Sequence, residues 1–167
     1  MKQKIIFAAF FLLVSFYSDG QKLRSYTDGA NGFSISYPNS WKKVSQPKKS
    51  TAKFVASFMN NGLTEASAII TIQPNINYVQ DSVYYHYMKG LHVQGEKVLI
   101  GGESVINGQK FYWFTTSIDN HLEYIKKLYY LTLYDDKLMI VRFIANQASK
   151  FDYYEPLFLN IANSIRL

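Results

Sequence analysis

Asp119, His121 and Glu123 are the only cluster in this sequence whose residue types and spacing suit a metal ion. In an extended segment, side chains two residues apart point to the same side, so these three would face one ion together. The same residues also serve as the polar end of a hairpin, which is the interpretation that the sequence favours. We therefore predict no metal site and no cofactor, and keep these three residues as metal candidates.

Other residues that commonly carry out chemistry form no recognisable site. His86 and His92 are six residues apart, about 240° on a helix, so they cannot share a metal as residues four apart do. The segment GGES, which ends at Ser104, lacks the second flanking glycine of a serine-nucleophile turn. The sequence also has no cysteine, no Walker loop and no dinucleotide-binding glycine motif. We predict that the protein is not an enzyme.

A basic segment is the most asymmetric feature of the chain. Seven lysines and arginines lie between Lys22 and Lys53, against one acidic residue, Asp28. A local positive field of this kind attracts anionic lipid, polyanions or an acidic partner. The partner-binding candidates are Lys42, Lys43, Lys48, Lys49 and Lys53. The alternative is that these lysines belong to a loop and serve only its solvation.

Arg142 lies in the middle of the apolar segment LMIVRFIA. Because an unpaired buried guanidinium is costly, we expect this side chain to face solvent or to pair with a carboxylate. The alternative is a role in recognition, for which arginine is well suited.

The first twenty residues predict a secretory signal peptide, residues 1–20. Two lysines precede an apolar run from Ile5 to Phe16, and small residues flank a cleavage site before Gln21. A membrane anchor is the alternative, but the run is shorter than the ~20 residues of a spanning helix. We therefore expect an exported protein, periplasmic or extracellular, with no membrane span after cleavage. Residues 21–30 would form a flexible leader and residues 31–167 a single domain.

The segment GFSISYPNSW predicts a strand that stops abruptly. Its residues alternate between apolar and polar from Phe33 to Tyr37, and Pro38 follows. Proline ends a strand ladder because it has no amide hydrogen to donate. The turn after it reverses the chain, so we expect Trp41 to be buried against the end of the sheet.

Two apolar stripes at helical spacing predict helices. The first runs from Asp81 to about Val93, with Asp81 or Ser82 as its N-cap. The second lies at the C-terminus, with Asp152 as a possible cap and Pro156 in its first turn.

Turn signals separate the expected strands. Asn61-Gly62 and Asp135-Asp136 predict hairpins, and Gly101-Gly102 predicts a break in a strand. The segment KFYWFTTSI is apolar on both faces, which indicates a sheet that is covered on both sides.

The chain resembles the PsbP-like family in the segment GFSISYPNSWKKV, which opens the domain, and in FDYYEPLFLNIANSI, which closes it. This family includes the photosystem-associated PsbP proteins, the Ran-binding Mog proteins and exported bacterial proteins of unknown role. The resemblance covers Asn31 to Leu167. It implies an α+β fold: an α/β/α sandwich with a central antiparallel sheet of about six to seven strands and helices on both faces. No functional residue is carried over, because no motif of the relatives matches residue by residue.

The resemblance implies a non-enzymatic binding or accessory module that docks onto a macromolecule. The predicted partner is a protein or an anionic component of the envelope, and we expect no nucleic acid. Two alternatives remain open. One is a hydrolase with an unrecognised site, and the other is a small-ligand or lipid carrier with an aromatic-lined cavity.

Overall fold

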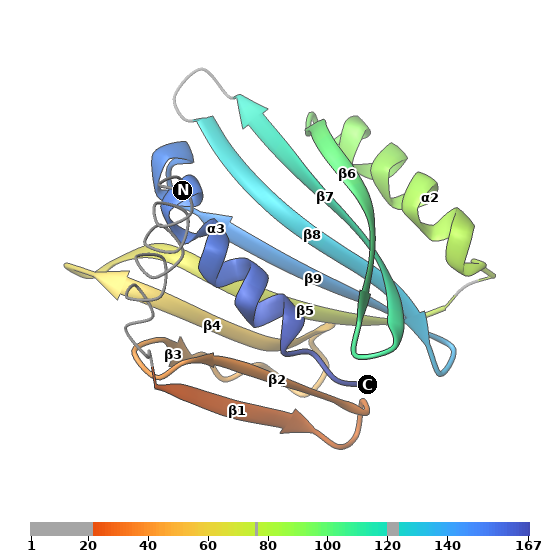
Figure 1. Cartoon of the computed structure of the whole chain (residues 1–167), viewed down its shortest axis with the longest axis horizontal. Coiled ribbons are helices and arrows are strands. Elements are labelled where there is room, and N and C mark those ends of the chain that lie inside the picture. Colours follow the sequence, from red (N-terminus) through yellow and green to blue (C-terminus); the bar gives the residue numbers. More distant parts are fainter. Residues whose placement is uncertain (1–21, 76, 120–123) are drawn as a thin grey trace, which may run out of the picture.

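The structure is a computed structural model that describes residues 22–75, 77–119 and 124–167. Within these residues the chain forms two antiparallel sheets and two helices (Figure 1). The small sheet pairs β1 (Leu23–Asp28) with β2 (Phe33–Pro38). The main sheet has seven strands in the order β3-β4-β5-β9-β8-β7-β6. The remaining elements are β3 (Lys42–Lys43), β4 (Ala52–Asn60), β5 (Leu63–Pro74), α2 (Gln80–Val93), β6 (Lys97–Ile106), β7 (Gln109–Asp119), β8 (Tyr124–Tyr134), β9 (Lys137–Ala145) and α3 (Ala148–Asn163). The predicted α+β fold with a central antiparallel sheet is confirmed.

Three hairpins of the main sheet share one kind of turn. The two-residue loops Asn61-Gly62, Asn107-Gly108 and Asp135-Asp136 all have positive φ at both positions. That backbone matches the right-handed twist of the flanking strands, and Asn, Asp and Gly adopt it most readily. The hairpins predicted at Asn61-Gly62 and Asp135-Asp136 are confirmed.

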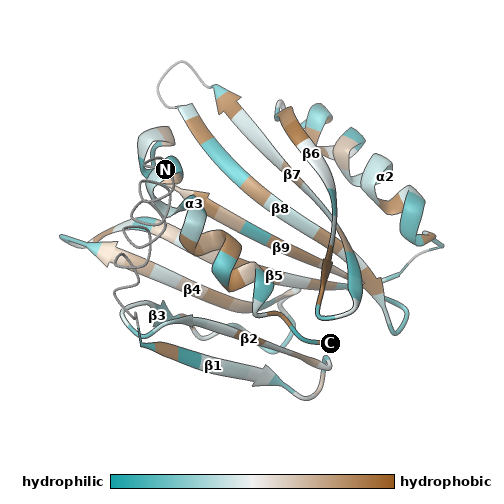
Figure 2. Cartoon of the chain, in the orientation of Figure 1, coloured by the Kyte–Doolittle hydropathy of each residue, from teal (hydrophilic) through white to brown (hydrophobic). Residues whose placement is uncertain are grey.

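The main sheet separates two apolar cores. Along β8, Leu128 and Tyr130 belong to the core beneath α3, whereas Tyr129 and Leu131 belong to the core beneath α2. Successive residues of a strand point to opposite faces, so the two cores lie on opposite sides of β8. Figure 2 shows hydrophobic and hydrophilic residues alternating along α3, as expected of a helix with one side against a sheet.

Trp41 is buried where β2 ends, as predicted. Its side chain is only 2% exposed, and its ring meets Phe158 of α3 edge-on at a centroid distance of 6.4 Å. The turn is closed by the Trp41 amide, which donates to the carbonyl of Pro38 at 3.0 Å. The indole therefore fills the core between the sheet and α3 rather than covering only the end of a strand.

The predicted flexible leader, residues 21–30, is wrong for most of its length. It contains β1, which pairs with β2 from Leu23 opposite Pro38 to Asp28 opposite Phe33. Tyr26 of β1 packs on Phe54 at a centroid distance of 5.2 Å. Sequence periodicity missed this strand because most of its side chains are exposed, so they show no apolar alternation.

The predicted break at Gly101-Gly102 is also wrong, because β6 is continuous through both residues. A β-carbon on Gly101 would lie 2.8 Å from Cβ of Phe114 and 2.8 Å from the carbonyl oxygen of Trp113. Glycine at position 101 therefore allows β6 to approach β7 closely. Close approach of another backbone is a common reason for glycine within a strand, besides a bulge or a bend.

The helix starts differ from the sequence predictions. The N-cap of α2 is Val79, since the carboxylate of Asp81 instead accepts a hydrogen bond from the Tyr112 hydroxyl at 2.5 Å. The helix α3 begins at Ala148, so Pro156 lies in its interior. The extra turns bury Phe151, which compensates for the hydrogen bond lost at the proline.

Candidate functional site

The metal candidates are only partly described by the structure. Asp119 is the last residue of β7, and His121 and Glu123 lie outside the described residues. Elsewhere in the part of the chain that the structure describes, no group of three or more histidine or acidic side chains could hold a metal ion. The metal candidates therefore stay a prediction.

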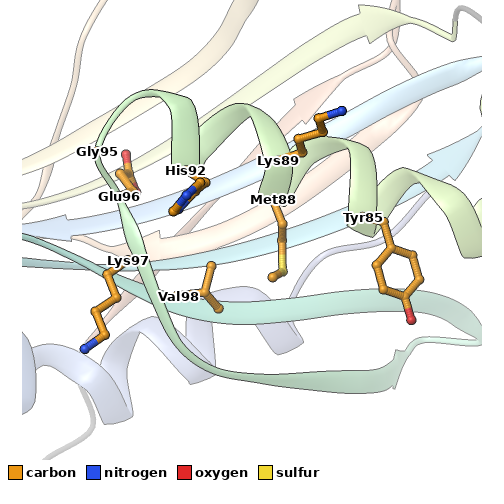
Figure 3. Close-up of a pocket in the computed structure, with 8 residues that line it drawn as sticks. All are labelled: Tyr85, Met88, Lys89, His92, Gly95, Glu96, Lys97 and Val98. Carbon is orange, nitrogen blue, oxygen red and sulfur yellow. The ribbon is translucent and has the colours of Figure 1, made fainter.

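A broad hollow of about 770 Å³ lies between α2 and the edge strand β6 (Figure 3). Figure 3 shows Met88 of the helix and Val98 of the strand reaching into the space between the two elements, with His92 beside them. Lys89 and Lys97 point away from it. The hollow is thus mainly apolar and lacks the convergent polar groups of a typical active site.

Glu96, one of the residues that line this hollow, is a buried acidic residue that is only 4% exposed. Its oxygens accept hydrogen bonds from Lys127 at 2.6 Å, from Thr116 at 2.7 Å and from the Tyr129 hydroxyl at 3.1 Å. Burial, and then the Glu96 charge, raise the pKa of Tyr129, so its hydroxyl stays protonated and continues to donate. Both Glu96 oxygens accept hydrogen bonds, and these bonds connect the segment after α2 to the sheet.

Sequence reasoning did not identify Glu96. It lies in the segment QGEK directly after the helix, where a glutamate normally faces solvent. Its partners are on β7 and β8, far along the chain, and no local pattern announces them. The available signal is that Thr116 and Lys127 are paired across β7 and β8, and each lies between two apolar or aromatic residues on the same face of its strand.

Arg142 lies on the same face of the sheet as Tyr129, its neighbour across the β8–β9 pair. Its side chain is partly buried, and its Nε is buried without a hydrogen-bond partner. No carboxylate among the described residues forms an ion pair with it. The carboxylate pairing that the sequence analysis allowed is therefore not found.

The five partner-binding candidates lie together on one short segment, residues 42–53, which we call the basic hairpin. Lys42 and Lys43 form β3, an edge strand of the main sheet, while Lys48 and Lys49 occupy the loop that leads to β4. Lys53 is the second residue of β4, and its ammonium donates to the carbonyl of Ser50 at 2.7 Å. All except Lys53 are exposed.

Two contacts attach the basic hairpin to the small sheet. The Lys43 ammonium lies 4.1 Å from the centroid of the Tyr26 ring, a cation–π geometry. The Tyr26 hydroxyl lies 3.5 Å from the Lys53 carbonyl, the long limit of a hydrogen bond. Burial, and then Asp28, raise the pKa of Tyr26, so the hydroxyl is a neutral donor at physiological pH. The strand β1, which the sequence analysis assigned to a flexible leader, thus contacts and supports the basic hairpin.

Four of the seven lysines in the second half of the chain form ion pairs, whereas none of the five in the basic hairpin pairs with a carboxylate of the described residues. Among the described residues, ion pairs form at Lys110, Lys126, Lys127 and Lys150, each with a carboxylate within 4.0 Å. None of the five hairpin lysines has such a carboxylate within residues 22–75, 77–119 and 124–167. Within the described residues no carboxylate neutralises their charge, and four of the five lysines are exposed.

The sequence profile of the PsbP family matches residues 21–167, which is most of the chain. The chain belongs to the PsbP family. No curated protein sequence matches it significantly. The recognition made from the sequence is confirmed, and the match includes the residues of β1 that the sequence analysis had assigned to a leader.

Solved structures share the fold at low sequence identity. The cyanobacterial PsbP (CyanoP) of Synechocystis sp. PCC 6803 is 19% identical with a TM-score of 0.67, covering 88% of this chain and 93% of that one. The Ran-binding protein Mog1p of Saccharomyces cerevisiae is 9% identical with a TM-score of 0.59, covering 87% and 95%. A Pseudomonas aeruginosa protein of unknown function, described as a putative regulator, is 10% identical with a TM-score of 0.58, covering 85% and 94%.

Proposed function

We propose that this protein is an exported, non-enzymatic binding module that docks through its basic hairpin onto an acidic surface of a partner protein. The observation that carries the proposal is the set of five lysines on one edge of the fold, none paired with a carboxylate of the described residues. Such a local field speeds encounter with an acidic partner and sets its orientation.

Two further features support docking onto a protein. The basic hairpin contains β3, a two-residue edge strand, and consecutive residues there point their charges to opposite faces. A partner that wraps an edge can meet both faces, whereas a flat membrane meets one. In addition, one structural relative is named as a Ran-binding protein, which places protein binding within the range of uses of this fold.

Charge reversal tests the docking surface. Lys48→Glu/Lys49→Glu is expected to elute from immobilised polyglutamate at lower salt than wild type, because it lacks part of the positive field of the basic hairpin. Salt elutes the wild-type protein by screening that field, since the Debye length falls from ~10 Å at about 0.1 M to ~3 Å at about 1 M. Folding should be unaffected, since exposed lysines contribute little to stability. The matched control is Lys89→Glu/Lys97→Glu, which makes the same change in net charge on exposed residues of α2 and β6.

The control variant should stay close to wild type. If both double variants elute alike, net charge alone governs retention and the basic hairpin is not a docking surface. Vesicles that contain anionic lipid form the second arm. If retention on vesicles depends on these charges and no retention occurs on polyglutamate, the basic hairpin binds a membrane surface rather than a partner protein.

Export is tested at the N-terminus of the secreted protein. We expect mass spectrometry to find a mature chain that starts near Gln21, because cleavage there removes the signal peptide and leaves β1 intact from Leu23. Recovery of the full-length chain in the membrane fraction would contradict the signal peptide. Among the described residues, no helix is long and apolar enough to cross a membrane.

A further inference from the structure

A polar cavity of about 320 Å³ lies beneath α2, on the side of β9 and β5. It is lined by side chains of the helix, among them His86 and Tyr87, and by Arg142 of β9. The volume is at the small end of the ~300–1,000 Å³ range of ligand pockets in proteins. This cavity is separate from the basic hairpin and from the functional proposal made for it.

The cavity contains a positive charge, Arg142, that forms no ion pair with a carboxylate of the described residues. Arg142 Nε is buried without a hydrogen-bond partner. The other charged residue in the wall, Glu96, is already paired with Lys127 at 2.6 Å and with Thr116 at 2.7 Å. A guanidinium has five N–H donors in a planar fork, and a buried donor left unsatisfied is costly. The geometry at Arg142 is therefore complementary to an anion with two oxygen acceptors.

Neighbouring groups add to this complementarity. Burial raises the pKa of Tyr87, so its hydroxyl is protonated at neutral pH and can donate to an anion beside Arg142. The Tyr129 hydroxyl is not available in the same way, because it donates to Glu96. The amides of Gln73 and Gln94 complete the polar lining.

An apolar wall completes the cavity. Leu91 of α2 is buried beside it, and Leu138 of β9 lies on the same face of the sheet as Arg142, four residues along the strand. A bare inorganic ion would leave this wall unused, whereas a small organic group would bury apolar surface against it.

We propose that this cavity binds a small organic anion, with its carboxylate or phosphate group on the Arg142 guanidinium and its apolar body against Leu91 and Leu138. Arginine is the residue best suited to such planar, two-point recognition, and lysine cannot reproduce it. The site requires no catalytic step and no metal.

Thermal unfolding with four probes tests the proposal: acetate, benzoate, inorganic phosphate and phenyl phosphate, each at millimolar concentration and constant ionic strength. A ligand that binds only the folded state raises Tm with concentration. For wild type we expect at least one probe to raise Tm, and the ring-bearing probe of each pair to act more strongly. Comparison of the carboxylate pair with the phosphate pair shows which head group the site takes.

Arg142→Met should abolish the probe-dependent rise, or weaken the apparent Kd about tenfold or more. Arg166→Gln is the matched control, because it removes the same charge from an exposed residue at the C-terminus and should keep the wild-type response. If Arg142→Met does not fold, Arg142→Lys keeps the charge without the planar fork and should bind more weakly. No rise in wild type, or equal rises in wild type and the Arg142 variant, would overturn the site.

Discussion

Trp41→Ala is expected to lower the free energy of unfolding by about 3–5 kcal/mol, the range for truncating a large buried aromatic side chain. The indole is 2% exposed and lies against Phe158, at the point where β2, the sheet and α3 meet. Truncation leaves a cavity that neither the sheet nor the helix can fill without moving, because the surrounding rings are themselves packed.

Chemical denaturation monitored by circular dichroism measures this loss. Trp41→Phe should lose less, since it keeps most of the apolar volume. Tyr153→Ala is the matched control on α3, where the ring is 75% exposed, and it should change stability by less than about 0.5 kcal/mol. A loss of that small size for Trp41→Ala would mean that the indole is not part of the core, and Trp41 would become a candidate for partner binding.

Glu96→Gln is expected to cost about 3 kcal/mol, near the lower end of the range for breaking a buried ion pair. The carboxylate side chain is 3% exposed and that of Lys127 is 14% exposed, so the ammonium would lose its partner while remaining largely shielded from water. The Tyr129 hydroxyl and Thr116 would also lose a charged acceptor.

A second variant separates the charge from the packing. Replacing both partners, Glu96→Leu/Lys127→Met, should cost less than Glu96→Gln if the unpaired ammonium causes most of the loss, and the loss that remains reports the Thr116 and Tyr129 hydroxyls left without their acceptor. Asp152→Asn serves as the surface control, since its pair with Lys126 is more exposed, and it should cost less than about 1 kcal/mol. Equal losses for Glu96→Gln and Asp152→Asn would show that Glu96 does not hold α2 to the sheet.

These two positions also differ in how far the sequence could predict them. Trp41 could be assigned to the core because an indole directly after a proline-terminated strand has few other low-energy positions. Glu96 could not, because its three partners lie 20, 31 and 33 residues further along the chain. Pairing of this kind depends on sheet registers, which no local pattern encodes.

The basic hairpin lies between these two cases. The sequence identified its five lysines, because a cluster of like charges is visible in the sequence itself. It did not identify β1, whose Tyr26 contacts both Lys43 and Lys53, since an exposed strand on a small sheet carries no apolar alternation. It also could not show that no carboxylate of the described residues pairs with these lysines, because that depends on where each carboxylate lies in space.

The central antiparallel sheet was implied by the resemblance to the PsbP-like family. By itself, the sequence determined the two predicted hairpins, the approximate extents of the helices and the burial of Trp41. These follow from turn conformations and apolar periodicity, which act over a few residues. Only the tertiary structure decided that Gly101 allows close approach to β7, that Glu96 is buried and paired, and that Arg142 lines a cavity with its Nε unsatisfied. Each of these depends on strands and a helix brought together from distant parts of the chain, where the burial of a polar group is set by its neighbours in space.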